Sequence, residues 1–156
     1  MITFIDVGRL GEMAGKISKN FTFEEFTKSD VASRFHINNA ISDWDVRDNI
    51  IALVENVLQP LRDAWGQPLF INSGYRSPEL NSHSMIGGSK TSQHVTGQAA
   101  DVGCSDPLAL ARLVKKLGLV YDQMILYPSF LHLSFRKDGE NRMQILYNKK
   151  YKGEEV

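Results

Sequence analysis

Two histidines and one aspartate in this chain have the chemistry to bind a single metal ion. His94 and Asp101 lie in the run Ser-Gln-His-Val-Thr-Gly-Gln-Ala-Ala-Asp at positions 92–101, and His132 follows in Leu-His-Leu-Ser at 131–134. Two imidazoles and one carboxylate give a zinc ion three protein ligands and leave a fourth tetrahedral position for water, as in catalytic zinc sites. These residues therefore predict metal-dependent hydrolysis.

The alternation of side chains along a β-strand supports this grouping. In a strand over 131–135 the apolar residues share one face, and His132 and Ser134 share the other. In a strand over 98–104, Asp101 lies on the same face as small residues, which leave room above the sheet. We therefore expect the histidine and the aspartate to reach a common space.

Gly97 lies between the two motif residues His94 and Asp101. A glycine there lets the chain change direction, so the imidazole can return to ligand distance from the aspartate. Cys104 falls on the opposite face of this strand and is not expected to be a ligand.

The same residues also have an ordinary interpretation, which spacing alone does not exclude. In it His94 is a loop residue, Asp101 a turn or cap acid, and His132 a half-buried strand histidine bonded to a backbone carbonyl. Two other histidines, His36 and His83, lie in polar surroundings and are predicted to be surface residues.

The elements that must position these residues form an α+β pattern. Apolar residues at three- and four-residue spacings predict the main helix over 44–61, and period-two or apolar runs predict strands. Shorter helices are expected at 23–29, from Pro78 and from Pro107 to Gly118, and strands at 69–72, 98–104, 122–126, 131–135 and 143–147. Short polar connectors favour antiparallel pairing of the last three strands.

Local signals mark where the helices begin. Thr22 and Glu25 fit a capping box for the first helix, and either Ser42 or Asp43 caps the main helix. Pro60 is expected to kink the last turn of that helix.

Composition fits one globular domain over residues 1–156. The chain is 42% hydrophobic and 23% charged, and 18 basic residues balance 18 acidic ones. Without a net field to attract nucleic acid or anionic lipid, binding is expected in a pocket. We expect no nucleic-acid partner and a monomer. The single cysteine cannot form an internal disulfide.

Both ends are expected to lie outside the regular fold, with 1–20 an irregular arm and 149–156 a solvated tail. Residues 1–16 lack the pattern of a signal peptide, and no apolar run is long enough to span a bilayer. These features predict synthesis in the cytoplasm, with other means of delivery for an external target.

Four motifs together resemble the M15 zinc peptidases, the D-alanyl-D-alanine carboxypeptidase group within the LAS metallopeptidases. They are Ser-Gly-Tyr-Arg-Ser at 73–77, Gly-Gly-Ser at 87–89, the run at 92–101 and His-Leu-Ser at 132–134. The likeness extends from about Phe21 to Tyr147. It implies a small central antiparallel sheet flanked by helices, one zinc ion, and peptidoglycan stem peptides as substrate.

The resemblance also implies roles for single residues. His94, Asp101 and His132 match the zinc ligands, and Arg76 matches an arginine that contacts the substrate. Chemically, Arg76 can anchor a carboxylate or stabilise a tetrahedral oxyanion. The other predicted substrate-binding residues are Ser92, Gln93, Tyr127 and Ser134, of which Ser92 and Gln93 could instead orient His94, and Tyr127 could donate to the oxyanion.

The general base departs from the family pattern. Many members have an acidic residue shortly before the last histidine ligand, but 126–131 reads Leu-Tyr-Pro-Ser-Phe-Leu. Asp122 is the nearest acid upstream and is our predicted base; a turn or cap aspartate is the alternative.

Three functions follow, in order of preference. The first is a zinc peptidase of peptidoglycan, acting at the bacterial cell wall after release, as a phage or prophage lysin would. The second is a module that keeps the zinc and binds a peptide or protein without hydrolysis. The third is a structural phage component without metal, which leaves the polar face of His132 and Ser134 unexplained.

Overall fold

The computed structural model describes residues 14–156. Most of the predicted N-terminal arm, residues 1–13, therefore lies outside the described residues. The described part of the arm, 14–20, consists mainly of bends, with one isolated antiparallel bridge from Lys16 to Thr22.

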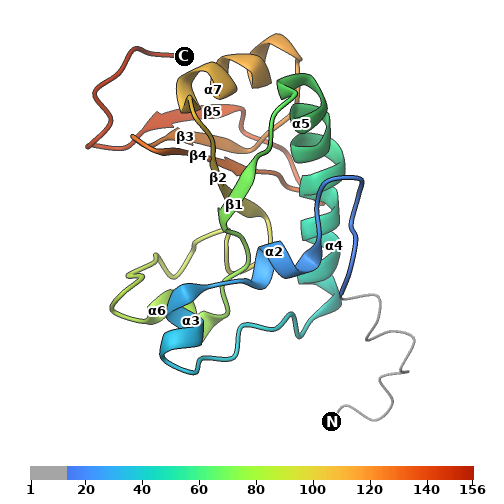
Figure 1. Ribbon diagram of the computed structural model, residues 1–156, viewed down its shortest axis with the longest axis vertical. Coiled ribbons are helices and arrows are strands. Elements are labelled where there is room, and N and C mark those ends of the chain that lie inside the picture. Colours follow the sequence, from blue (N-terminus) through green and yellow to red (C-terminus); the bar gives the residue numbers. More distant parts are fainter. Residues whose placement is uncertain (1–13) are drawn as a thin grey trace.

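A five-stranded sheet forms the centre of the molecule, with strand order β1-β2-β4-β3-β5 (Figure 1). The strands are β1 (Phe70–Ser73), β2 (Ala99–Gly103), β3 (Gln123–Leu126), β4 (Phe130–Ser134) and β5 (Gln144–Tyr147). Helices accompany this sheet, so the predicted α+β class is confirmed.

The sheet is mixed rather than purely antiparallel, which corrects the prediction for its last strand. β2 and β3 pair antiparallel with β4, but β5 runs parallel to β3 at the edge of the sheet. Because both sides of β4 are already paired, the chain after it cannot add a neighbouring antiparallel strand. Instead, residues 135–143 connect β4 to the far side of β3. There β5 pairs with β3 and runs parallel to it.

One long helical segment covers residues 44–65, somewhat further than the predicted 44–61. It comprises α4 (Trp44–Leu53), a π-helical turn η1 (Val54–Leu58) and α5 (Gln59–Trp65). Asp43 is its N-cap, because its side chain accepts from the backbone N–H groups of Asp45 and Val46. The wide turn lies where the Pro60 ring crowds the carbonyl four residues earlier, so the predicted kink takes the form of a π-helical turn.

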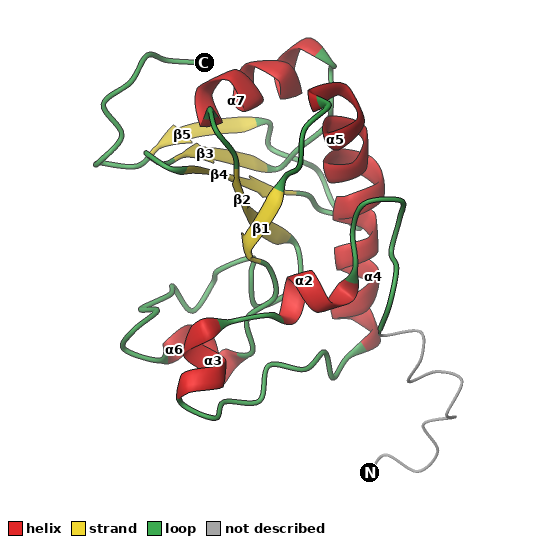
Figure 2. Cartoon of the chain, viewed as in Figure 1, coloured by secondary structure: helices red, strands yellow, loops and turns green. Residues whose placement is uncertain are grey.

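The long helix and α7 (Pro107–Lys116) supply much of the core. α5 packs against α7, which in turn packs on β3 and β4 (Figure 2). Ile50, Leu53, Leu58 and Leu61 are fully buried along the long helix. Burial of such side chains removes apolar surface from water and is the main stabilising term for this packing.

Three short helices build the part of the molecule that carries the β1–β2 connection. They are α2 (Phe23–Thr27), α3 (Asp30–Arg34) and α6 (Pro78–Ser82). The predicted capping box of Thr22 and Glu25 is present at α2. The helix stops at Thr27, before the predicted end, because Ser29 caps α3, a helix that the sequence pattern did not predict.

In the part of the chain that the structure describes, the buried apolar residues form a cluster that joins α2, the long helix, α7 and the sheet. Among the described residues, no helix has the length and apolar character required to cross a bilayer.

Candidate metal centre

Asp101 and His132 lie directly opposite each other on adjacent strands. They form one register pair between β2 and β4, and the Oδ1 atom of Asp101 is 2.9 Å from Nδ1 of His132. The alternation predicted from the two strand sequences therefore brings both side chains to the same face. The sheet itself sets their separation.

His94 reaches the same carboxylate from a loop. Its Nε2 atom is 3.2 Å from Oδ1 of Asp101, and its Nδ1 atom is 2.7 Å from the backbone oxygen of Gly74. Since Nδ1 donates its proton to that carbonyl, Nε2 is left with a lone pair facing the aspartate. The imidazole is 2% exposed, so water does not compete for this arrangement.

The loop reaches the strand through Gly97, as predicted. Gly97 has a φ of +76°, and a Cβ atom there would lie 2.7 Å from the backbone oxygen of Val46 in α4. A side chain at this position would both strain the backbone and push the His94 loop away from the helix.

These three side chains fit one metal ion. Among the described residues, His94, Asp101 and His132 form a group whose ligand atoms all lie within 4.8 Å of one another. Tetrahedral ligands at about 2 Å from zinc are separated by about 3.3 Å. The two nitrogen-to-oxygen distances in this group, 2.9 and 3.2 Å, are close to that value.

The carboxylate of Asp101 is the anionic ligand of the group. Burial raises the pKa of Asp101, but its contacts with His132 and His94 outweigh burial. The net shift is well below the ordinary pKa of an aspartate, so the group is ionised and ready to bind a cation.

Arg76 lies beside this group and is held from three directions. Its Nε donates to Oγ of Ser73 at 3.1 Å, its Nη1 donates to Oδ1 of Asn81 at 2.9 Å, and its Nη2 is 4.0 Å from Oδ2 of Asp101. Its backbone N–H also donates to the carbonyl of His94. Burial lowers the pKa of Arg76, and Asp101 and Tyr127 oppose that shift.

Asn81 is a positioning residue that the sequence analysis missed. It is 3% exposed, and its Nδ2 donates to the backbone oxygen of Ser89 at 2.8 Å while its Oδ1 accepts from Arg76. A Cβ atom on Gly88 would collide with the Asn81 amide. The Gly-Gly-Ser motif was the available signal, since a glycine there allows this close approach.

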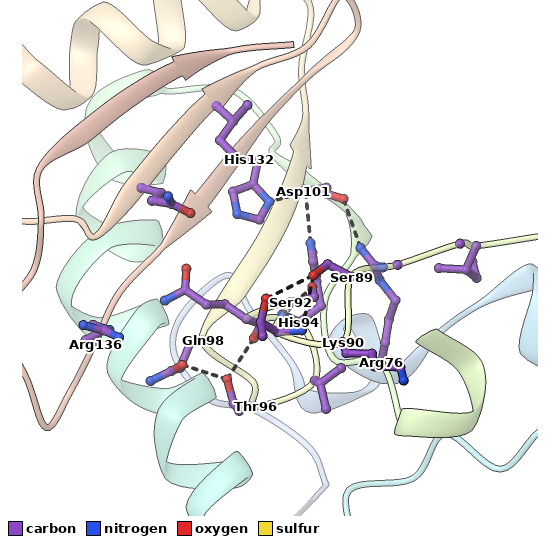
Figure 3. Close-up of a pocket in the computed structure, with 18 of the residues that line it drawn as sticks. Arg76, Ser89, Lys90, Ser92, His94, Thr96, Gln98, Asp101, His132 and Arg136 are labelled. Atoms are coloured by element: carbon purple, nitrogen blue, oxygen red, sulfur yellow. Dashed lines mark hydrogen bonds and ion pairs between the residues drawn. The ribbon is translucent and has the colours of Figure 1, made fainter. Parts of the chain in front are cut away.

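The metal group opens into a pocket of about 790 Å³. The pocket brings together most of the residues predicted for the site: Arg76, Ser92, Gln93, His94, Asp101, Tyr127 and His132 all line it. In Figure 3 His132 and Asp101 project from the sheet, and His94 and Arg76 approach them from the loops below. Tyr127 stacks on Phe130 with ring centroids 4.2 Å apart.

Two predicted site residues, Asp122 and Ser134, do not line this pocket. Ser134 is fully buried, and its Oγ accepts from the backbone N–H of Gln123 at 2.9 Å. This contact links β3 to β4, and it keeps the hydroxyl out of the space where a substrate would lie.

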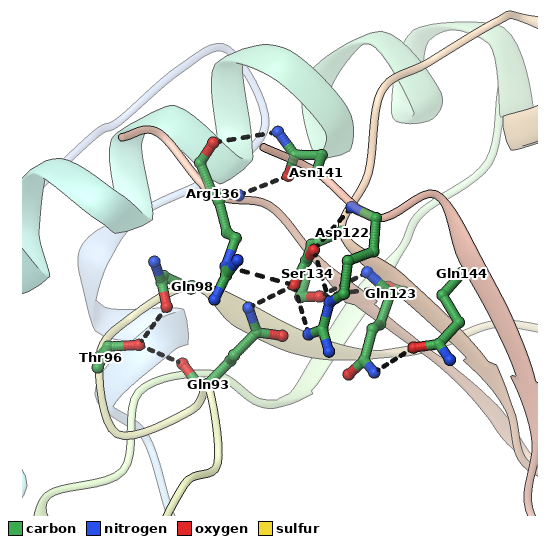
Figure 4. A network of polar contacts seen from close by, with 10 residues as sticks. Gln93, Thr96, Gln98, Asp122, Gln123, Ser134, Arg136, Asn141 and Gln144 are labelled. Atoms are coloured by element: carbon green, nitrogen blue, oxygen red, sulfur yellow. Dashed lines mark hydrogen bonds and ion pairs between the residues drawn. The ribbon is translucent and has the colours of Figure 1, made fainter. Parts of the chain in front are cut away.

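The Asp122 carboxylate is likewise fully buried, in a network of donors (Figure 4). Arg142 donates from Nε and Nη2 to its two oxygens at 3.0 and 2.7 Å, and from the backbone N–H at 2.9 Å. Nε2 of Gln93 donates to Oδ2 at 2.9 Å. The bonds from Arg142 are the main reason that the pKa of Asp122 falls to about 2. Such a carboxylate is a weak proton acceptor, and its role as general base remains a prediction.

The remaining histidines and the cysteine lie away from the metal group. His36 is exposed, and His83 packs against Phe35 with ring centroids 4.4 Å apart. Cys104 is half-buried and packs against the core. Arg136, Arg142 and Lys90 also line the pocket but were not predicted. Signals were available for two of them, since Lys90 lies between two of the motifs and Arg136 continues the two-residue spacing of His132 and Ser134. Arg142 has no such link to a motif.

Comparison with known proteins agrees with this geometry. A family model described as Peptidase M15 matches residues 19–134, a range that contains all three residues of the metal group. A zinc D-Ala-D-Ala carboxypeptidase from Streptomyces albus G is 32% identical over 110 residues, which are 64% of this chain and 38% of that protein. The chain thus spans well under half the length of this relative. The matched range, with the metal group inside it, shows that the chain belongs to the peptidase M15 family.

Proposed function

We propose that this protein is a zinc-dependent peptidase that hydrolyses an amide bond next to a D-amino acid in bacterial peptidoglycan stem peptides. Family membership and the relative's name support zinc and this substrate class. One observation carries the proposal: the ligand atoms of His94, Asp101 and His132 converge at a pocket that the partly buried Arg76 also lines.

Bound zinc supplies Lewis-acid polarisation of the scissile carbonyl and a lowered pKa for a water molecule. His94 and Asp101 would hold the ion together with His132. The bond from His94 to the Gly74 carbonyl fixes the tautomer and direction of the imidazole.

Arg76 is our proposed anchor for the terminal carboxylate of the substrate. The contacts of Nε and Nη1 with Ser73 and Asn81 fix the plane of the guanidinium. A planar guanidinium of fixed orientation can bind a carboxylate through two parallel hydrogen bonds. Partial burial strengthens these bonds because the group is less well hydrated.

Tyr127 is our proposed donor to the oxyanion. Its pKa is raised, chiefly by burial and further by Asp101, so the phenol keeps its proton at neutral pH. A protonated hydroxyl in the pocket can donate to developing negative charge.

Ser92 and Gln93 are proposed to orient the loop and the peptide. Oγ of Ser92 accepts from the backbone N–H of His94 at 3.2 Å, which stabilises the turn that carries the imidazole. The amide of Gln93 is oriented by Asp122, and its buried Oε1 atom has no hydrogen-bond partner among the described residues. That oxygen is an acceptor for an N–H group.

A second candidate function is a zinc-retaining module that binds a peptide without cleaving it. The observation in its favour is that, among the described residues, Asp101 is the only carboxylate that lines the pocket. A peptidase needs a group to accept the proton of the attacking water. Action at the cell wall as a phage-type lysin stays a prediction of the peptidase function alone.

The decisive experiment is mass spectrometry of defined muropeptides after incubation with the zinc-loaded protein. A chelated sample and a His132→Ala variant are the negative controls, and His83→Ala is the matched histidine control. Loss of one D-alanine would establish a carboxypeptidase, and conversion of cross-linked dimers to monomers an endopeptidase. Intact muropeptides with a protein shown to hold zinc would favour the binding module.

A further inference from the structure

The charges around the pocket are unbalanced, although the chain as a whole is neutral. Eighteen basic residues balance eighteen acidic ones over the sequence. Among the described residues that line the pocket, however, Arg76, Lys90, Arg136 and Arg142 are basic and Asp101 alone is acidic. The local field therefore favours an anionic ligand, before any metal ion adds its own charge.

The arginines of the pocket occupy two separate sides of the metal group. In Figure 3 Arg76 and Lys90 lie on one side of His94 and His132, and Arg136 lies on the other. Arg76 follows β1, whereas Arg136 and Arg142 belong to the 135–143 connection between β4 and β5. Basic side chains thus border the pocket on both sides of the metal group.

Asp122 contacts both arginines of the second side, Arg136 and Arg142, but its single negative charge does not neutralise both of them. It binds Arg142 through both carboxylate oxygens, and its Oδ2 is 3.7 Å from Nε of Arg136. One buried carboxylate thus accompanies two guanidinium groups, which leaves one positive charge in excess. The side chains of Arg136 and Arg142 are 45% and 48% exposed.

Donors remain for a ligand on this side. A guanidinium has five N–H donors, and Arg142 uses its Nε and Nη2 groups on Asp122. The backbone of Arg136 is fixed independently, because its N–H and carbonyl both bond to the Asn141 side chain. Arg136 also borders a second hollow that contains Asp45, Asp48 and Asp138, whose charges disfavour an anion there.

We propose that Arg136 and Arg142 form a subsite for a second carboxylate of the substrate, on the side of the scissile amide opposite Arg76. The inference rests on the proposed peptidase function and specifies its substrate class. The preferred peptide carries a terminal carboxylate, which Arg76 binds, and an acidic residue on the amino-terminal side of the cleaved bond. Peptides in which that acid is amidated are poorer substrates.

The test compares two N-acetylated peptides that end in D-Ala-D-Ala and differ only in having glutamate or glutamine immediately before that dipeptide. For the wild type we expect kcat/KM to be about five- to tenfold higher for the glutamate peptide, because a charge-assisted hydrogen bond is stronger than a neutral one. In Arg136→Gln the ratio falls to near one. Lys137→Gln removes the same charge from the next residue, which does not line the pocket, and keeps the wild-type ratio.

A binding measurement separates the subsite from catalysis. The two shortened peptides that end in a single D-alanine are titrated calorimetrically into the zinc-loaded wild type and Arg136→Gln. We expect tighter binding of the glutamate product by the wild type only, with a difference that shrinks as salt is added. Equal binding and equal cleavage of both peptides by the wild type would overturn the subsite and leave the peptidase intact. Carboxylate-dependent binding without any cleavage would support the subsite and reject the peptidase.

Discussion

Asp101 and His132 face each other across β2 and β4, with Oδ1 of the aspartate 2.9 Å from Nδ1 of the histidine. Two of the three proposed ligands are therefore fixed by one pair of hydrogen-bonded strands. The third, His94, comes from a loop that is secured by the Gly74 carbonyl. The site therefore combines two ligands on a rigid sheet with a third on a loop of defined position.

Replacing His132 by alanine should remove the metal. The variant loses one of three protein ligands, and we expect zinc affinity to fall by more than about 100-fold, since even the loss of a residue that only supports a ligand costs about 10- to 100-fold. Metal content after dialysis against dilute zinc, measured by inductively coupled plasma mass spectrometry, checks this. His83→Ala should retain about one ion per chain. Equal zinc in both variants would refute the assigned site.

Replacing Arg76 by lysine should weaken catalysis while preserving charge. Lysine cannot reproduce the planar pair of donors or the bonds to Ser73 and Asn81. We expect kcat/KM for a peptide with a free terminal carboxylate to fall by about 10- to 100-fold, as for the loss of a hydrogen bond to a charged group. A C-terminally amidated peptide provides the comparison. An equal loss for both peptides would argue against carboxylate binding by Arg76.

Replacing Asp122 by asparagine should lower the stability of the fold. Because the pKa of Asp122 is lowered to about 2 in the folded protein, its ionised form stabilises the fold above the unfolded value of 3.8. This contribution is lost as the pH falls through the folded pKa. We expect the variant to be less stable than the wild type by about 1–2 kcal/mol at pH 7, a figure reduced from the pKa shift because the two arginines are half-exposed. Urea unfolding from pH 7 to pH 2 should show this difference shrinking below pH 4.

The same variant tests the predicted general base. As the predicted base, Asp122 should be required for turnover, so we expect the folded, zinc-loaded Asp122→Asn protein to lose activity by about 100-fold or more. Unchanged turnover would reject the assignment and would leave Asp122 as a buried partner of Arg142.

Replacing Tyr127 by phenylalanine should lower kcat with little change in KM. The hydroxyl is proposed to bond only to charge that develops during the reaction, so its loss affects the transition state. We expect a reduction of about tenfold. Tyr147→Phe, on the exposed edge strand, is the control and should be fully active. A change confined to KM would indicate that Tyr127 contacts the bound substrate instead.

Local patterns in the sequence were sufficient to predict most elements of the fold. The capping box at Thr22, the cap at Asp43 and the helix after Asp106 are all present, because short-range hydrogen bonds determine them. The parallel pairing of β5 was not predictable in this way. It depends on β4 being already paired on both sides, which is a property of the whole sheet.

The candidate site, too, could be predicted from local sequence patterns only in part. The grouping of Asp101 with His132 followed from strand alternation, and Gly97 indicated how His94 could return to them. The burial of Asp122 and Ser134 was not predictable, since their partners are Arg142, 20 residues further along the chain, and the backbone of Gln123. Alternation indicates a face of a sheet, but it does not show which part of that face is covered.

The direct register pair between Asp101 and His132 also makes the ion a reporter of correct folding. Side chains alternate along a strand, so a slip of one residue between β2 and β4 would turn His132 toward the apolar core. A misaligned sheet could retain its secondary structure and still lack the site. The fraction of chains that hold zinc therefore measures how much of a preparation has the native strand alignment, which circular dichroism would not detect.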